Sequence, residues 1–129
     1  MDFRNKSRKD IGNWGEEAAA EYLRRLGFRI LGRNIAFKTG ELDVVAQKGN
    51  TIHIVEVKTL LCENFPSGSL DRYSPADNLS AYKLRKLVRT AEWYLAKRNW
   101  EGEWQVDGAL VWIQASDGVA RVCYLPRIV

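Results

Sequence analysis

The sequence is poor in cysteine and has no long apolar segment. Its two cysteines, Cys62 and Cys123, do not form a C-x-x-C metal-binding motif and can make at most one disulfide. The first residues are charged and lack the apolar core of a signal peptide, and no stretch reaches the ~20 apolar residues of a membrane helix. We therefore expect reduced thiols, a cytoplasmic location and no membrane partner.

The composition is that of one ordinary globular domain. The chain has 129 residues, of which 46% are hydrophobic and 28% charged, and it contains no internal repeat. Twenty Lys and Arg against sixteen Asp and Glu give a net charge of +4. This mild excess favours polyanionic partners such as nucleic acids without establishing one. Residues 1–11 contain four basic residues, and we expect them to form a flexible basic arm.

The segment from Gly40 to Lys58 has the pattern of a β-hairpin. Two stretches of alternating polarity flank a polar K-G-N turn, which is typical of a tight strand connection. Closing this turn places Val45 opposite Ile54 and Asp43 opposite Glu56. Leu42 is then expected on the face of the first strand opposite to Asp43.

Two facing carboxylates require an explanation. Like charges directly opposite each other destabilise a strand pair by up to ~1 kcal/mol, and burial adds a desolvation cost. Asp43 and Glu56 then either retain a proton or bind a divalent cation, and Lys58 lies on the same face as Glu56. The alternative is a solvated strand edge on which Lys58 discourages further pairing.

A helix is expected over 13–26, because Ala19 and Leu23 belong to an apolar stripe and Gly27 is suited to end the helix. Glu16 lies at the margin of this stripe. It either caps the first turn or reaches over the sheet, and the sequence leaves both readings open.

A strand is expected over 28–37, with Gly32 as a bend or bulge and Arg33 where the strand leaves the core. Residues 60–76 have no periodic pattern and contain proline and glycine. We expect a mobile loop there, which would be a flap over a substrate, a dimer contact or simple disorder.

A second helix is expected over 75–98, with either Ser74 or Ser80 as its N-cap. Lys83 and Arg89 belong to a basic run in its first half. Such a run forms either a solvated face or a phosphate-binding surface.

Two final strands are expected over 104–113 and 119–126, joined by a D-G turn. Asp107 is unusual inside an apolar strand, and we expect it at a bulge beside Gly108. The tryptophans of this half are expected in the core or at its rim rather than as platforms for nucleobases: Trp93, Trp100 and Trp104.

The predicted order is α-β-β-β-α-β-β, which favours a single α/β domain with a mixed central sheet flanked by helices. An acid on the first helix, G-E-L-D on one strand and V-E-V-K on the next resemble the PD-(D/E)xK nuclease fold. More closely, the chain resembles the bacterial YraN-type family, which is similar to archaeal Holliday junction resolvases. The segments that carry the resemblance are G-N-W-G-E-E-A-A-A-E-Y-L-R-R-L-G (12–27), R-N (33–34), G-E-L-D (40–43), V-E-V-K (55–58) and K-L-R-K-L-V-R-T-A-E-W-Y-L (83–95).

The resemblance implies a restriction-endonuclease-like αβββαβ core in a single nuclease-like domain over 12–129. It implies catalytic roles for Glu16, Asp43, Glu56 and Lys58. The implied cofactor is Mg²⁺ or Mn²⁺, held by Asp43, Glu56, Glu16 and the carbonyl of Val57, with Glu16 binding directly or through water.

Arg33, Lys83 and Arg89 are expected to hold the nucleic-acid backbone. Two positions depart from the family pattern, because Leu60 and Gln105 stand where the family commonly has arginine. Both changes remove candidate phosphate contacts.

The implied function is metal-dependent hydrolysis of phosphodiester bonds in DNA, with branched or structured DNA as a candidate substrate. One alternative is a non-catalytic nucleic-acid-binding or repair-accessory protein that keeps the nuclease fold. Another is an interaction module whose charged hairpin lies at a protein interface. A junction resolvase needs two active sites and hence a homodimer, which the sequence leaves open.

Overall fold

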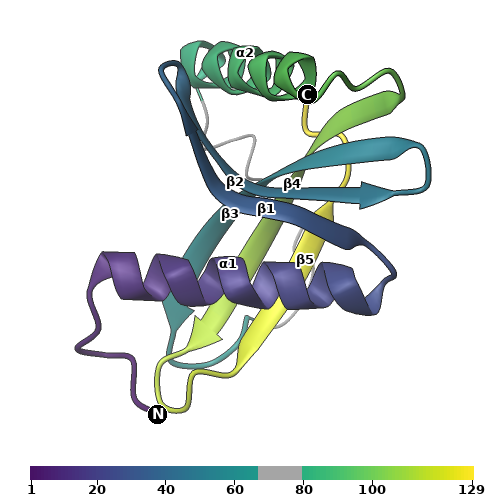
Figure 1. Cartoon of the computed structure of the whole chain (residues 1–129). Helices are drawn as coiled ribbons and strands as arrows, with labels where there is room; N and C mark the ends of the chain where they lie inside the picture. Colours follow the sequence, from purple (N-terminus) through teal and green to yellow (C-terminus); the bar gives the residue numbers. More distant parts are fainter. Residues whose placement is uncertain (67–79) are drawn as a thin grey trace.

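The five expected strands pair in chain order into one mixed sheet in the computed structural model, which describes residues 1–66 and 80–129 (Figure 1). Neighbouring strands are antiparallel except β3 and β4, which are parallel and are joined through α2. The elements are α1 (Arg8–Arg25), β1 (Arg29–Phe37), β2 (Gly40–Lys48), β3 (Thr51–Cys62), α2 (Ala81–Lys97), β4 (Glu103–Gln114) and β5 (Ala120–Leu125).

The hairpin has the predicted register. Val45 pairs with Ile54, and the strands are connected through Gly49, whose φ of 60° suits a tight turn. The predicted irregularity at Gly32 is confirmed, because the β1–β2 register shifts between Ile30 and Gly32.

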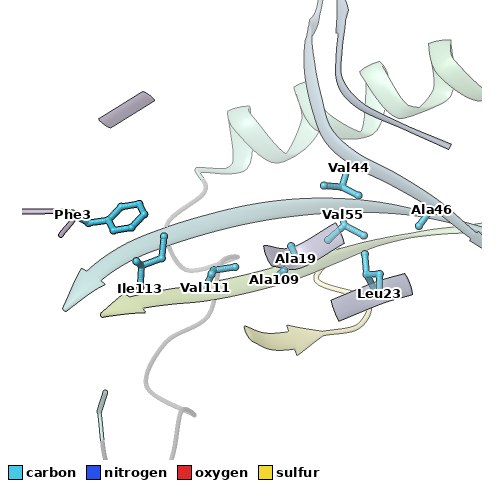
Figure 2. Packing of buried hydrophobic residues seen from close by; sticks show 9 residues of the cluster. All are labelled: Phe3, Ala19, Leu23, Val44, Ala46, Val55, Ala109, Val111 and Ile113. Atoms are coloured by element: carbon cyan, nitrogen blue, oxygen red, sulfur yellow. The ribbon is translucent and has the colours of Figure 1, made fainter. Parts of the chain in front are cut away.

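The two helices lie against opposite faces of the sheet and define two apolar clusters. Ala19 and Leu23 of α1 pack on Val55 of β3, as Figure 2 shows for the first cluster. The second cluster joins α2 to the other face, where Leu87 packs near Ile54. Successive residues of β3 thus point to opposite layers, as expected for a strand that is covered on both sides.

Leu42 departs from the predicted alternation. It was expected on the face of Val44, but it packs in the second cluster together with Val45. The β2–β3 pairs end at Val44 and Val55, so the start of β2 continues only as a two-stranded ribbon with β1. Such ribbons twist more strongly than wide sheets, and this twist carries Leu42 to the side of α2.

The predicted basic arm over 1–11 is wrong at several positions. Ser7 accepts a hydrogen bond from the N–H of Asp10 and caps α1, so the helix begins about five residues before the predicted start of 13. Phe3 is buried in the first cluster, and its N–H donates to the carbonyl of Ala115. Burial of this ring anchors the start of the chain to the sheet.

The predicted loop over 60–76 begins too early. β3 extends to Cys62, and its last residues pair in parallel with β4 as far as Gln114. Ser80 caps α2 by accepting from the N–H of Lys83, whereas the alternative cap, Ser74, lies outside the described residues. Residues 67–76 of the predicted loop also lie outside them.

Close contact between α1 and β3 depends on Gly15. A Cβ atom at this position would lie 1.9 Å from the Oγ1 of Thr59, so only glycine permits the observed approach. Gly15 thereby sets the distance between the following residue, Glu16, and the sheet. Among the described residues, no helix is long and apolar enough to cross a membrane. Cys62 and Cys123 are free thiols, as predicted.

Candidate functional site

Asp43 and Glu56 meet where β2 diverges from β3. The last β2–β3 pair joins Val44 to Val55. Asp43 directly precedes Val44 on β2, and Glu56 directly follows Val55 on β3. The Oδ2 atom of Asp43 accepts the backbone N–H of Val57 at 2.9 Å, and the side chains of Asp43 and Glu56 are hydrogen-bonded to each other. The two carboxyl groups predicted to face each other are therefore in contact.

Both carboxyl groups hold protons more tightly than free ones. Burial raises the pKa of Asp43 to about 6, with a further contribution from the charge of Glu16, although the N–H of Val57 opposes the rise. Burial and then the charge of Asp43 raise the pKa of Glu56 to about 8. At pH 7 the pair therefore shares about one proton, with Glu56 as the donor to Asp43.

Glu16 is the third acid of the site. The cap of α1 is Ser7, nine residues earlier, so the capping interpretation of Glu16 is wrong. The side chain of Glu16 is largely buried, and its Oε1 lies 3.7 Å from a guanidinium nitrogen of Arg33. Among the described residues this buried oxygen has no hydrogen-bond partner. Glu16 faces the acidic pair closely enough to raise the pKa of both members.

The three acids do not form a ready-made set of metal ligands. Within residues 1–66 and 80–129, no group of three or more His, Cys, Asp or Glu side chains has an arrangement that could hold an ion. The structure thus brings Asp43 and Glu56 together and leaves Glu16 at longer range.

Lys58 and Val57 continue the same strand beyond the acidic pair. Lys58 is exposed and lies two residues after Glu56, on the same face of β3. Val57 joins the site through its N–H bond to Asp43. The use of the Val57 carbonyl as a ligand stays a prediction.

A pocket of about 200 Å³ adjoins the pair and is bordered by both acids and bases. Glu56 and Glu41 line it from the sheet, and Lys83 and Lys86 line it from α2. The predicted Lys83 is therefore beside the candidate site. Thr90 holds α2 at this position.

Thr90 joins α2 to the β1–β2 turn. Its hydroxyl lies 2.7 Å from that of Thr39, and it donates to the carbonyl of Lys86 at 2.8 Å. A Cβ atom on Gly40 would approach Thr90 Oγ1 to 3.3 Å, so glycine at this turn keeps the helix close. This contact explains how basic residues from a distant helix reach the acidic hairpin.

The other two predicted phosphate ligands are placed differently. Arg33 forms ion pairs with Glu16 and Glu17 and donates to the carbonyl of Asn13 at 3.4 Å. It therefore connects β1 to α1 within the protein. Arg89 is exposed and lines a separate pocket together with Thr39 and Trp93.

Sequence reasoning missed Lys86, Glu41 and the role of Asp107. The first two belong to the recognisable basic run and the G-E-L-D motif, so their neighbours could have indicated them. Asp107 was expected at a bulge, but the β3–β4 register is continuous through it and the side chain is fully buried. Its carboxylate accepts hydrogen bonds from the side chains of His53, Gln105 and Tyr124 and from the N–H of Arg127.

The Asp107 cluster is separate from the acidic pair. Burial raises the pKa of Asp107, but the hydrogen bonds, first that of His53 and then that of Tyr124, outweigh it and lower the pKa below its usual range. The Nδ1 atom of His53 lies 2.6 Å from the Oδ2 atom of Asp107. Both side chains point to the side of α1, where the ring of Phe28 packs on His53. These contacts fix the end of the chain against the sheet.

The chain is similar to many bacterial proteins. It is 43% identical to a UPF0102 protein of Syntrophotalea carbinolica over 91 residues, which cover 70% of this chain and 68% of the relative. It is 40% identical to a relative from Persephonella marina over 92 residues, covering 71% and 73%. It is 31% identical to one from Helicobacter pylori over 111 residues, covering 86% and 89%.

A family model described as "Uncharacterised protein family UPF0102" matches residues 15–113. The matched region begins at the glycine that packs α1 on β3 and includes the acidic pair, Lys58 and all of α2. It ends one residue before the end of β4. The chain belongs to the UPF0102 family, in agreement with the YraN-type resemblance of its motifs.

Proposed function

We propose that this chain is a metal-dependent endonuclease that hydrolyses phosphodiester bonds of DNA, with branched or structured DNA as the preferred substrate. The proposal includes a restriction-endonuclease-like origin of the αβββαβ core. The observation that carries it is the hydrogen-bonded Asp43–Glu56 pair at the β2–β3 fork, with lysines on two sides. A protein that needed only a stable fold would gain from replacing such a pair with uncharged residues.

The residues present fit a hard divalent cation. Asp43 and Glu56 offer carboxylate oxygens, the ligand type that Mg²⁺ and Mn²⁺ prefer. The buried Oε1 of Glu16 has no hydrogen-bond partner among the described residues and faces the same region. Asp43 and Glu56 would hold the cation, with the Val57 carbonyl and Glu16, directly or through water, as further ligands. When bound, the cation supplies a water of lowered pKa and neutralises charge on the phosphate.

The protein's own groups then have separate tasks. The Asp43–Glu56 pair must release its shared proton for both carboxylates to act as ligands. Lys58 carries a compact positive charge beside the pair, where it would orient the attacking water or stabilise the phosphate oxygens. Lys83 and Lys86 would hold the DNA backbone at the pocket edge without reading its sequence.

Arg33 would support the site indirectly. Its ion pairs with Glu16 and Glu17 hold Glu16 at the edge of the acidic region. This role replaces the direct phosphate contact expected from the sequence. Arg33 therefore positions an acid, whereas the phosphate contacts come from α2.

A non-catalytic DNA-binding protein is the second candidate. The observation that favours it is the lack of a three-acid ligand arrangement in the described residues. On this account the basic residues of α2 bind DNA, and the acidic pair only limits where the backbone can approach.

Cleavage assays separate the two candidates. Wild type, Asp43→Asn and Lys58→Ala are incubated with Mg²⁺ or Mn²⁺ and duplex, branched or single-stranded DNA. Lys97→Ala, which removes an exposed lysine at the other end of α2, is the matched control. The proposal expects cleavage by wild type and the control, and loss in both site variants. Cleavage unaffected by Asp43→Asn contradicts the site, and salt-sensitive binding without cleavage supports the second candidate.

A further inference from the structure

We propose that the exposed face of α2 binds a single strand of DNA, with Trp93 as a stacking platform for an unpaired base. The proposal refines the substrate class of the proposed function, on which its link to cleavage rests. The binding itself is independent of catalysis and is tested separately.

Four exposed residues of α2 form one stripe in which two basic side chains lie between two aromatic ones. At about 100° per residue, their positions fall within an arc of about 60°. The residues are Tyr82, Lys86, Arg89 and Trp93. The Lys86 ammonium lies over the Tyr82 ring, 5.5 Å from its centroid, so one aromatic and one basic member of the stripe are in contact. Proteins hold single-stranded nucleic acid by combining basic side chains with exposed aromatic rings in this way.

Trp93 is the most unusual member of this stripe. It is 58% exposed, which excludes the core and leaves the rim of the two positions expected for it. The side chain borders a pocket of about 400 Å³ together with Phe37, Lys38, Thr39 and Arg89. An apolar hollow of this size with two aromatic walls can receive a flat, uncharged base.

The charges around this pocket fit a nucleotide rather than an apolar ligand alone. Lys38 and Arg89 stand at the pocket and can hold the phosphates on either side of a stacked base. Glu92 does not line this pocket but a neighbouring hollow, which Arg89 and Trp93 also border. Both charged residues at the Trp93 pocket itself are therefore basic, which favours a polyanion there.

The Trp93 pocket adjoins the acidic site. Thr39 lines both this pocket and the one that contains Glu56 and Lys83. From Lys83 to Trp93 the helix rises about 15 Å, a length that a few nucleotides span. A strand bound along α2 would thus pass from the stacking platform to the acidic pair.

An unpaired base is the feature that Trp93 selects. Lysines and arginines bind the phosphates of duplex and single strand alike, whereas a ring can stack only on a base whose face is open. Frayed ends, flaps and branch points supply such bases. The stripe therefore favours DNA with single-stranded segments over a closed duplex.

The test measures binding without cleavage. Affinities of a fluorescent oligothymidine and of a blunt-ended linear duplex are measured by anisotropy in EDTA for wild type, Trp93→Ala and Trp93→Phe. Trp104→Ala, at an exposed tryptophan on β4, is the matched control. Loss of base stacking predicts that Trp93→Ala weakens oligothymidine binding about 10-fold, and that Trp93→Phe restores most of it. The salt dependence should stay unchanged, because no charge is lost.

Unchanged oligothymidine binding by Trp93→Ala overturns the inference, and so does an equal loss for the duplex. Circular dichroism of each variant confirms folding, and Trp93→Leu, which keeps an apolar side chain but has no aromatic face, replaces the alanine variant if that variant is unstable. Failure of the proposed function has a different signature. In that case wild type cleaves no DNA, or Asp43→Asn cleaves normally, while the Trp93-dependent preference for single strands persists.

Discussion

Replacing Glu56 with glutamine should stabilise the metal-free protein at alkaline pH. Glutamine keeps the size of the side chain and can still donate a hydrogen bond to Asp43. It removes the second negative charge that wild type must hold beside Asp43 once both acids are ionised. We therefore expect Glu56→Gln to unfold at a higher temperature than wild type at pH 9.

The size of the effect follows from the pKa of Glu56. A rise from the usual 4.5 to about 8 converts, at ~1.36 kcal/mol per pH unit, to a ceiling of roughly 5 kcal/mol. Solvent reaches part of the pair and screens the repulsion. We therefore expect Glu56→Gln to raise the free energy of unfolding at pH 9 by about 2 kcal/mol. For a domain of this size that corresponds to about 8 °C in the melting temperature.

The sign of the pH dependence is fixed by the same shifts. Between the unfolded values near 4 and the folded values of about 6 and 8, the folded state holds protons that the unfolded state has lost. Wild-type stability from this pair is therefore greatest near pH 4 and falls until the pH exceeds 8. The advantage of Glu56→Gln over wild type should be near zero at pH 4 and largest at pH 9.

Thermal unfolding followed by circular dichroism from pH 4 to 9 measures this difference. Glu101→Gln, at an exposed acid outside the site, serves as the matched control and should follow wild type. If Glu56→Gln and wild type lose stability in parallel over the whole range, the acidic pair is not strained by its charges and the reasoning is refuted.

Gly15→Ala should destabilise the fold by roughly 1–3 kcal/mol, because its Cβ would collide with Thr59; adding Thr59→Ala should recover part of the loss in urea unfolding. Asp107→Ala should cost roughly 3–5 kcal/mol, because it leaves His53 and other buried donors unpaired; a loss below 1 kcal/mol would argue against the cluster's structural role. Lys58→Ala should change stability by less than about 0.5 kcal/mol and still abolish cleavage; a large drop in melting temperature would show instead that this exposed lysine supports the fold.

Local patterns predicted the hairpin and the acidic pair correctly. A two-residue turn fixes the register of the strands beside it, so the contact between Asp43 and Glu56 followed from their distance to Gly49. The bulge near Gly32 was also readable, because glycine inside a strand pattern commonly marks one.

Features that depend on distant segments were not readable. The first turn of α1 has no apolar periodicity, and the burial of Phe3 depends on Ala115 more than one hundred residues away. The partners of Asp107 come from three separate segments, so an acid in an apolar strand could not be distinguished from one at a bulge. Leu42 lies on the side of α2 because β2 twists where it is no longer paired with β3. The alternation of polar and apolar residues does not reveal such a twist.

The binding of Mn²⁺ tests the central claim about the acidic pair most directly. Isothermal titration at pH 7 in two buffers of different ionisation enthalpy reports both the binding of the cation and the protons released. We expect wild type to bind Mn²⁺ with release of up to about one proton, since Asp43 and Glu56 share one in the free protein. Asp43→Asn should abolish both signals. Equal binding by wild type and Asp43→Asn, or no binding by wild type, would contradict the account.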